Sequence, residues 1–106
     1  MFNPGSFAEE PFRMTVEDVF SIQGRGTVVT GRVEAGTVQV NDPVTFQMAN
    51  GRTRRTKVAG LETFQKMLQA AHAGDNVGVL LKGVRPGEIG RGMALVRPGS
   101  PAAPRY

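Results

Sequence analysis

Short apolar runs, separated by glycine, proline, asparagine and aspartate, recur along most of the chain. They are rich in valine, threonine and phenylalanine, and they read FRMTVEDVFSI, GTVVTGRVEAGTVQV, PVTFQM, TKVAGLETF, NVGVLLK and GMALVRP. Runs of this length and composition, bounded by turn residues, are typical of β-strands. Because no long helical pattern separates them, the sequence predicts an all-β fold, either a closed barrel or a sandwich.

One segment has the spacing of a helix instead. Phe64, Met67, Leu68 and Ala71 follow the i, i+3, i+4, i+7 rule, which would place them on one face of a helix. The segment is only about ten residues long and ends at Gly74. We therefore expect a helical turn that caps one end of the barrel.

The stretch EDVFSIQGRGTVVTG predicts two strands joined by a tight turn, since Gly24 and Gly26 can adopt the positive φ angles that such a turn needs. Apolar residues occupy both alternating sets of positions here, whereas one face of a half-buried sheet is normally polar. Phe20, Ile22 and Val28 are therefore expected to form an apolar patch on the outside, suited to a flat ligand such as a base. The alternative is that a bulge turns part of this ribbon inward, or that the terminal segments cover it.

Composition limits the class of protein. The chain has 106 residues, 40% hydrophobic and 21% charged, and no cysteine, so one globular domain without disulfides or thiolate chemistry is expected. The start lacks the features of a signal peptide, and no apolar run approaches the roughly 20 residues of a membrane helix. We expect a soluble, cytoplasmic protein with a flexible lead-in over residues 1–10, a barrel over residues 11–99 and a tail over residues 100–106.

The formal net charge is +4, and ten of the thirteen basic residues are arginine. Arginine presents a planar fork of donors that suits phosphate, which favours an anionic partner such as RNA, although the same charge also keeps a small protein soluble. Arg52, Arg54, Arg55 and Lys57 fall in the stretch QMANGRTRRTKVA, which we interpret as a hairpin loop. That loop either contacts RNA phosphates or is a solvated loop that discourages edge pairing between sheets.

Four separated motifs point to a known family. They are EDVFSIQGRGTVVTGRVEAGTVQV, GLETFQKMLQ, AGDNVGVLLKGV and EIGRGMALVRPGS. In this order they resemble the second domain of bacterial elongation factor Tu, over about residues 11–100. The resemblance implies a six-stranded Greek-key β-barrel of the translation-protein type.

The resemblance also implies a use for the outer patch. In the family this surface receives the 3′-terminal adenosine and aminoacyl ester of aminoacyl-tRNA, by stacking and by hydrogen bonds to a splayed base. Carried over, Ile22, Val28 and Leu80 would enclose the adenine. Glu62 would accept from the ribose or the base, and Asn76 would bind the aminoacyl group. The full set of matching positions is Glu17, Asp18, Phe20, Ile22, Gly24, Val28, Thr30, Glu62, Gln65, Asn76 and Leu80.

The chain also departs from the family pattern. Gln65 stands where the family has an arginine, which removes a cation from beside the terminal nucleotide, and Ala35 replaces a second arginine. The stretch QMANGRTRRTKVA does not follow the family closely. These departures leave two classes of function open. One is an RNA-binding or ribosome-docking barrel. The other is an orphan protein-interaction module that has lost RNA binding and docks a partner, or a second copy, through the outer patch.

No catalytic arrangement is recognised in the sequence. The phosphate-binding pattern G-x-x-x-x-G-K-(S/T) does not occur, so GTP cannot be bound in the way that the family's GTPase domain binds it. His72 is the single histidine, and with no cysteine present the sequence excludes metal clusters and Cys–His pairs. We interpret His72 as a surface residue in a turn, and expect a non-enzymatic protein without a cofactor or a metal.

The expected partner is RNA, either the 3′ end of tRNA or ribosomal RNA, bound weakly because one barrel offers few contacts. A protein partner or a GTPase subunit joining in trans is the alternative, and the oligomeric state is left open. Met1 and the divergent tail favour a stand-alone protein over a piece of a longer one.

Overall fold

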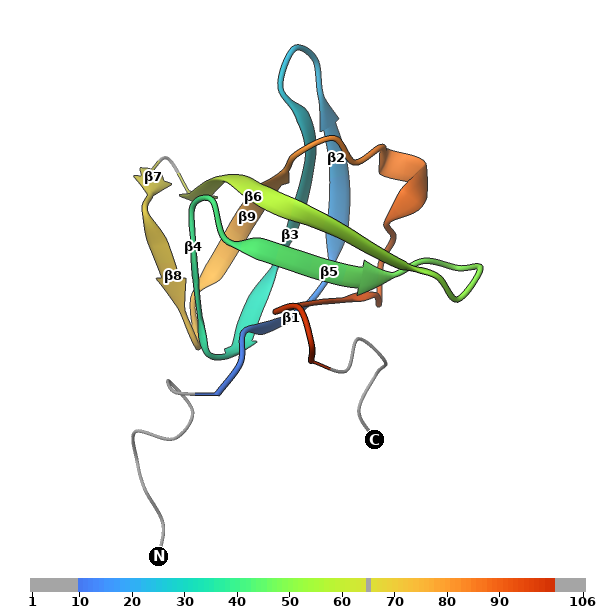
Figure 1. Ribbon diagram of the computed structural model, residues 1–106. Helices are drawn as coiled ribbons and strands as arrows, with labels where there is room; N and C mark the ends of the chain where they lie inside the picture. Colours follow the sequence, from blue (N-terminus) through green and yellow to red (C-terminus); the bar gives the residue numbers. More distant parts are fainter. Residues whose placement is uncertain (1–9, 65, 101–106) are drawn as a thin grey trace, which may run out of the picture.

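Six antiparallel strands close into a barrel in the computed structural model, which describes residues 10–64 and 66–100 (Figure 1). β1 pairs with β10 on one side and with β3 on the other, and these two pairings complete the ring. The strands follow one another around it as β1 (Arg13–Thr15), β10 (Ala94–Val96), β5 (Pro43–Gln47), β6 (Thr53–Thr63), β9 (Asn76–Leu81) and β3 (Gly26–Ala35). The predicted all-β, six-stranded barrel is confirmed.

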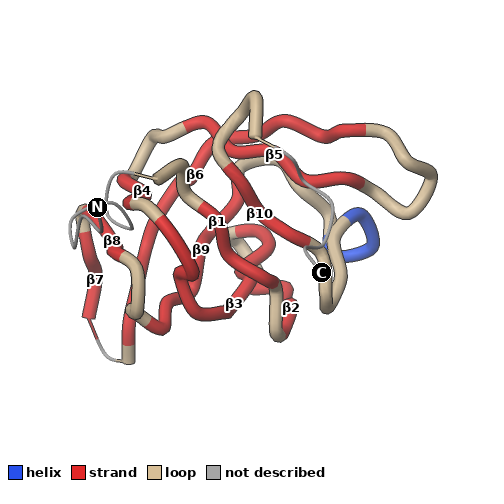
Figure 2. The backbone as a smooth tube through the Cα atoms, turned by 90° about the horizontal axis from the view of Figure 1, so that it is seen from below, coloured by secondary structure: helices blue, strands red, loops and turns tan. Residues whose placement is uncertain are grey.

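Four shorter strands extend the barrel. β2 (Asp18–Ile22) forms a hairpin with β3, and β7 (Lys66–Leu68) forms a hairpin with β6. β4 (Thr37–Gln39) and β8 (Ala70–His72) pair as a separate two-stranded sheet. Figure 2 shows the strands around the barrel and one short 3-10 turn, Pro86–Glu88, at its end. The two hairpins, β2–β3 and β6–β7, rise from the same side of the barrel (Figure 1).

The barrel interior is filled by apolar side chains from all six strands. The largest fully buried side chains include Phe46, Met14, Leu61, Leu81 and Leu95. They alternate with outward residues because side chains point to opposite faces at successive positions of a strand. The apolar alternation of the sequence therefore predicts the inward face of each long strand.

The turn after β3 packs closely against the segment that leads into β1. Gly36 adopts a φ of +71°, and a Cβ atom placed there would lie 2.6 Å from the backbone nitrogen of Phe12 and would also meet the carbonyl oxygen of Glu10. Only glycine allows both this left-handed conformation and this close approach.

The predicted helical turn over residues 64–71 is wrong, because this segment forms β7 and β8. Leu61 pairs with Leu68 and Glu62 pairs with Met67 across the β6–β7 hairpin, and Val38 pairs with Ala71 across β4 and β8. The helical spacing arose because two short strands follow each other with a bend at Gln69 between them. Strand pairing with β6 and β4 outweighs a local pattern of four apolar residues.

The ends of the predicted domain lie largely outside the described residues. Of the expected lead-in and tail, the structure describes Glu10 and Ser100. Within residues 10–64 and 66–100, no helix has the length and apolar character that crossing a membrane requires.

Candidate functional site

An open hollow of about 420 Å³ lies on the outer surface between the β2–β3 hairpin and the β6–β7 hairpin. We call it the outer pocket. Its volume falls within the roughly 300–1,000 Å³ typical of small-molecule sites. The pocket is lined from β2, β3, β6, the turn after β6, and β9, by Phe20, Ile22, Val28, Thr30, Glu62, Thr63, Phe64, Asn76, Val77 and Gly78.

Strand register brings the outward residues of four strands to this place. Val28 lies opposite Phe20 in β2 and opposite Leu80 in β9. Two residues along β3, Thr30 lies opposite Gly78, which in turn lies opposite Glu62 of β6. Residues two apart share a face of a sheet. The outer surface of the barrel therefore has an apolar row beside a polar row.

Val28 forms part of the floor of the outer pocket. Its side chain is 4% exposed, yet it lies outside the cluster of buried side chains that fills the barrel. Phe20 is 52% exposed and stands at the rim. The β2–β3 pairing runs from Asp18 to Ile22 without a shift in register. No bulge therefore turns this ribbon inward, and Phe20, Ile22 and Val28 face outward while Val29 faces the core.

Gly78 is buried at the floor, where Val28 and Glu62 close over the position that a side chain would fill. A Cβ atom there would lie 3.2 Å from Cγ1 of Val28 and 3.4 Å from Cγ of Glu62, closer than side chains normally pack. The same Cβ would lie 3.7 Å from Oε1 of Glu62. The Glu62 carboxylate thus leans over the glycine and places a hydrogen-bond acceptor beside the apolar floor.

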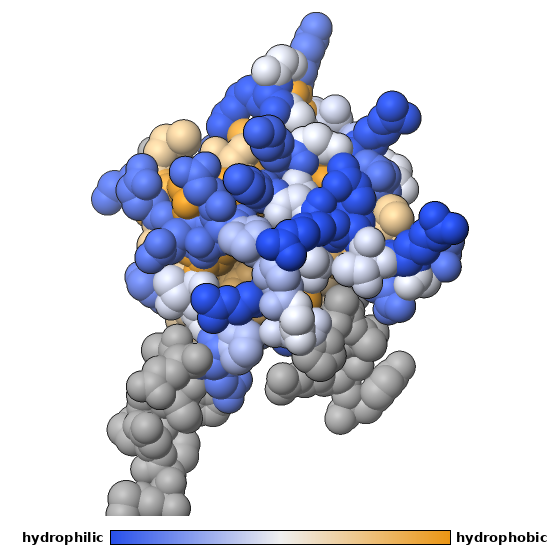
Figure 3. All heavy atoms as spheres, in the orientation of Figure 1, coloured by the Kyte–Doolittle hydropathy of each residue, from blue (hydrophilic) through white to orange (hydrophobic). Residues whose placement is uncertain are grey.

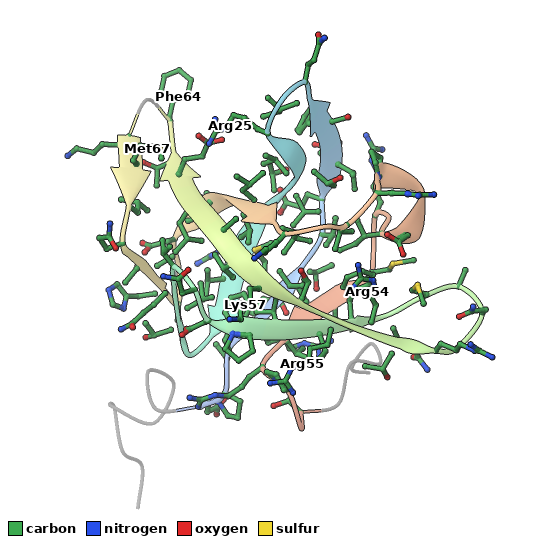
Figure 4. The ribbon with its side chains drawn as sticks, turned by 45° about the horizontal axis from the view of Figure 1, so that its top comes forward. Arg25, Arg54, Arg55, Lys57, Phe64 and Met67 are labelled. Atoms are coloured by element: carbon green, nitrogen blue, oxygen red, sulfur yellow. The ribbon has the colours of Figure 1, made fainter. Side chains whose placement is uncertain are left out.

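The rim carries apolar side chains that face solvent. Phe64 is 92% exposed and Met67 is 69% exposed, both at the β6–β7 hairpin. Figure 4 shows Phe64 pointing away from the barrel at the tip of this hairpin, with Arg25 reaching toward it from the opposite hairpin. In Figure 3 hydrophobic atoms are visible among hydrophilic ones in the same part of the surface. A ligand in the pocket would meet an apolar rim on one side and a cation on the other.

Six of the eleven residues predicted for the pocket line it: Phe20, Ile22, Val28, Thr30, Glu62 and Asn76. Leu80 lies beside the floor as the register partner of Val28, but it is not among the lining residues. Gly24 lies at the tip of the β2–β3 hairpin, where its φ is +79° and its Cβ position has open space around it. Gln65 lies outside the described residues.

The two predicted acidic residues, Glu17 and Asp18, have other contacts. The Glu17 backbone N–H donates to the carbonyl of Thr30 at 2.7 Å, and its side chain lines a different open hollow of about 690 Å³. Asp18 accepts a hydrogen bond from Nη2 of Arg91 at 2.7 Å. Neither carboxylate lines the outer pocket.

Sequence reasoning missed four lining residues, Thr63, Phe64, Val77 and Gly78. Phe64 was assigned to the helical face that does not form. Gly78 had a usable signal, because a glycine at an outward position of a β-strand often marks a close approach by a ligand or another backbone.

A scan against models of protein families matches residues 26–96 to the model described as elongation factor Tu domain 2. The chain belongs to this family. The match runs from the first residue of β3 to the last residue of β10, so it includes the β3, β6 and β9 walls of the outer pocket. A translation-factor-like, non-catalytic β-barrel is therefore the fold to which the pocket belongs.

The basic stretch of this elongation factor Tu domain 2 barrel differs from the predicted hairpin loop. Arg52 lies in the turn between β5 and β6, whereas Arg54, Arg55 and Lys57 lie within β6 itself. Strand β6 is longer than expected because it pairs with β5 from Thr53 onward. Neighbouring residues of a strand point to opposite faces, so Arg54 and Arg55 cannot act as one unit.

Arg54 is bound to the end of the barrel. Its Nη2 donates to the carbonyl of Gly83 at 2.8 Å, and its Nε lies 3.5 Å from Oε2 of Glu88. The pKa of Glu88 is lowered, first because its carboxylate accepts the backbone N–H of Arg85 at 2.9 Å and also because Arg54 is near. These contacts fasten the 3-10 turn to β6, and they occupy the guanidinium that the sequence suggested for phosphate.

His72 is exposed, and it lies at the end of β8 rather than in a turn. Its Nδ1 is 3.2 Å from Oγ1 of Thr37 on the paired strand β4. Among the residues that the structure describes, no group of three or more potential ligands could hold a metal ion.

Proposed function

We propose that this domain 2 barrel binds the 3′-terminal adenosine and aminoacyl group of an aminoacylated RNA in the outer pocket, as a non-enzymatic, cytoplasmic component of translation. One observation supports this proposal above the others. The Phe20–Ile22–Val28 surface and the polar side chains of Glu62 and Asn76 come from separate parts of the chain and line the same open hollow.

The chemistry of the hollow suits a nucleoside. A base would rest on the apolar floor formed by Val28 and lie against Phe20 at the rim, as splayed RNA bases do on apolar and aromatic side chains. Glu62 accepts hydrogen bonds only, when it is ionised, and so suits a ribose hydroxyl or an exocyclic amine. Asn76 both donates and accepts, which suits the ester and amine of an aminoacyl group.

A barrel alone should bind such an end weakly, because it offers few contacts and no second domain to close over the ligand. A GTPase subunit that joins in trans would supply the remaining contacts. We therefore expect dissociation constants in the upper micromolar to millimolar range for the barrel by itself, which is about 4–5.5 kcal/mol of binding free energy.

The second candidate is a protein-interaction module, which the exposed Phe64 and Met67 side chains favour. On this reading the rim and floor of the outer pocket dock an apolar segment of a protein. Salt separates the two candidates, because binding to RNA phosphates weakens steeply as ionic strength rises and apolar docking does not.

The deciding experiment compares two short RNA hairpins with the same CCA end, one aminoacylated and one blocked by a 3′-phosphate. We expect the aminoacylated RNA to shift the amide resonances of Val28, Gly78 and Glu62 at a lower concentration than the RNA blocked by a 3′-phosphate does. Glu62→Gln should weaken that binding by roughly 10- to 150-fold, since a hydrogen bond to a charged group is worth about 1.5–3 kcal/mol. Glu34→Gln, a carboxylate outside the pocket that pairs with Arg13, is the matched control. Equal binding of the two RNAs would contradict the proposal.

A further inference from the structure

Three basic side chains lie exposed next to one another on the outer face of the barrel: Arg55 and Lys57 of β6, and Lys82 directly after β9. The backbone N–H of Lys82 donates to the carbonyl of Lys57 at 3.0 Å, so these two residues are immediate neighbours across the strands. Between Arg55 and Lys57, Thr56 is buried and its hydroxyl bonds the carbonyl of Lys82. We call the three side chains the cationic strip.

The cationic strip is continuous with the outer pocket. Leu80 lies opposite Val28, the residue at the pocket floor. Lys82 is two positions further along, on the same face and about 6.6–6.8 Å away at the usual rise of a strand. From Lys82 the strip crosses to Lys57 on β6 and then follows that strand to Arg55. Figure 4 shows Lys57 and Arg55 on the face of β6 and Arg54 displaced toward the end of the barrel.

The charges of the cationic strip are not neutralised by ion pairs in the described part of the chain. The three salt bridges found there join Arg13 to Glu34, Arg54 to Glu88 and Arg91 to Asp18. The acidic residue Asp42 lies at the edge of the strip, since its backbone carbonyl accepts the N–H of Val58. Its carboxylate accepts the backbone N–H of Gln39 at 2.8 Å. The strip therefore presents positive charge to solvent beside a pocket of the right size for one base.

We infer that the cationic strip binds the phosphates of the single-stranded RNA nucleotides that precede the base in the outer pocket. The inference rests on the proposed function, because it takes the pocket as the site of the terminal base. It assigns phosphate binding to Lys82, Lys57 and Arg55, and it removes Arg54 from that role. Proteins that bind single strands combine surfaces on which bases stack with a cationic track for the backbone. Phe20 and Val28 supply the first feature, and the strip supplies the second.

The cationic strip also explains how RNA could be held without the arginine that Gln65 replaces. The sequence lacks the family's cation beside the terminal nucleotide, and the three cations of the strip would contact the phosphates of the preceding nucleotides instead. Each phosphate contact on a single strand contributes about 0.7 to the slope of log K against log salt concentration. Three contacts would give a slope of about 2.

The test measures binding of a fluorescein-labelled single-stranded RNA dodecamer that ends in CCA, by anisotropy, between 25 and 300 mM KCl. The strip variant is Lys57→Gln with Lys82→Gln. The matched control is Arg52→Gln with Arg91→Gln. Both residues are exposed, Arg52 in the β5–β6 turn and Arg91 beside Asp18, and this variant lowers the net charge equally. We expect the strip variant to reduce the slope by about 1.4, and the control to leave it near the wild-type value. Circular dichroism and thermal unfolding check that both variants keep the fold.

The outcomes separate the strip from the proposed function. If strip and control variants have the same slope, the inference is overturned, whether or not the 3′ end is recognised. Suppose that the slope of log K against log salt concentration falls only in the strip variant, and that a 3′-phosphate on the RNA does not change its affinity. The strip then binds RNA, and the adenosine proposal fails. If the wild-type protein binds RNA with an affinity that does not depend on salt, the inference is overturned. If it binds no RNA at 25 mM KCl, both the inference and the proposed function are overturned.

Discussion

Filling the floor of the outer pocket with one methyl group gives the sharpest test of where a ligand rests. In Gly78→Ala the new Cβ would lie 3.2 Å from Cγ1 of Val28 and 3.4 Å from Cγ of Glu62. The neighbours must then move by a few tenths of an ångström. The methyl group would push the side chains of Val28 and Glu62 outward, toward the space that a ligand would occupy.

The effect on stability should be small, because two contributions oppose each other. Alanine is favoured over glycine in the interior of a strand by roughly 0.5–1 kcal/mol, whereas overpacking costs about 1–3 kcal/mol in a tight site. Glu62 and Val28 line an open hollow and can shift toward it, so the cost belongs at the low end of that range. We expect the free energy of unfolding to change by less than about 2 kcal/mol. Thermal unfolding can measure this, because a change of 1 kcal/mol shifts the Tm of a domain of this size by about 4–8 °C.

The effect on binding should be larger. A base that rests on the floor would be lifted, and a gap of 0.5–1 Å loses a quarter to a half of the dispersion energy. Stacking of a base is worth about 1–3 kcal/mol, and a misplaced hydrogen bond to Glu62 adds about 0.5–1.5 kcal/mol. Together these predict a loss of about 1–3 kcal/mol, which is a 5- to 150-fold rise in Kd.

The assay is titration of the aminoacylated RNA hairpin, followed by the amide resonances around the outer pocket. Gly87→Ala is the matched control, because it adds the same methyl group in the 3-10 turn, where no other heavy atom lies within 4 Å. If Gly78→Ala keeps the fold and binds RNA as tightly as Gly87→Ala does, the ligand does not rest on this floor.

Two further predictions concern the barrel itself. Gly36→Ala should destabilise the fold by more than the roughly 1 kcal/mol typical of point changes, because the residue has a positive φ and its Cβ would strike the backbone of residues 10–12. Gly51→Ala is the control, since the Cβ of residue 51 meets open space. If urea unfolding shows that Gly36→Ala loses no more stability than Gly51→Ala does, this reasoning is wrong. The folded-state pKa of Glu88 lies below its ordinary value of 4.5, chiefly because the carboxylate accepts the N–H of Arg85. The ionised carboxylate therefore contributes to stability above the unfolded pKa, and this contribution is lost as pH falls through the folded pKa. Thermal unfolding between pH 2 and 7 should therefore show a smaller acid-side decline in Tm for Glu88→Gln than for wild type, and parallel curves would contradict the assignment.

The strands of the barrel could be predicted because their pattern is set by burial on one face. Val29 and Val33 of β3 alternate with outward residues, as do Val77 and Val79 of β9, and these alternations are visible in the sequence. The β6–β7 segment could not be predicted in the same way. The β8 strand that follows pairs with β4, which is distant in sequence, and Met67 of β7 faces solvent although it is apolar.

The candidate site was predictable only in part, for a related reason. Alternation along a regular hairpin favoured an outward position for Phe20 and Ile22, but apolar residues on both faces left an inward bulge as the alternative. The role of Arg54 could not, because its ion pair with Glu88 joins β6 to a turn some thirty residues later. Nor could Lys82 be grouped with Lys57, since their contact depends on the register between β6 and β9. Local pattern predicts which face a residue occupies, and tertiary pairing decides what it meets there.

The ring of the barrel is sealed by β1, which hydrogen-bonds to both β3 and β10. Until β10 has docked, β1 and β5 each expose an edge whose backbone groups lack partners, and such edges invite pairing with other chains. Since Arg13 pairs with Val96, the seal joins residues at opposite ends of the domain, and contacts this distant in sequence slow the search for the native state. A chain truncated before β10 would therefore keep the edges of β1 and β5 unpaired and be prone to aggregation. The three-residue strand β10 protects the folded molecule by covering both edges.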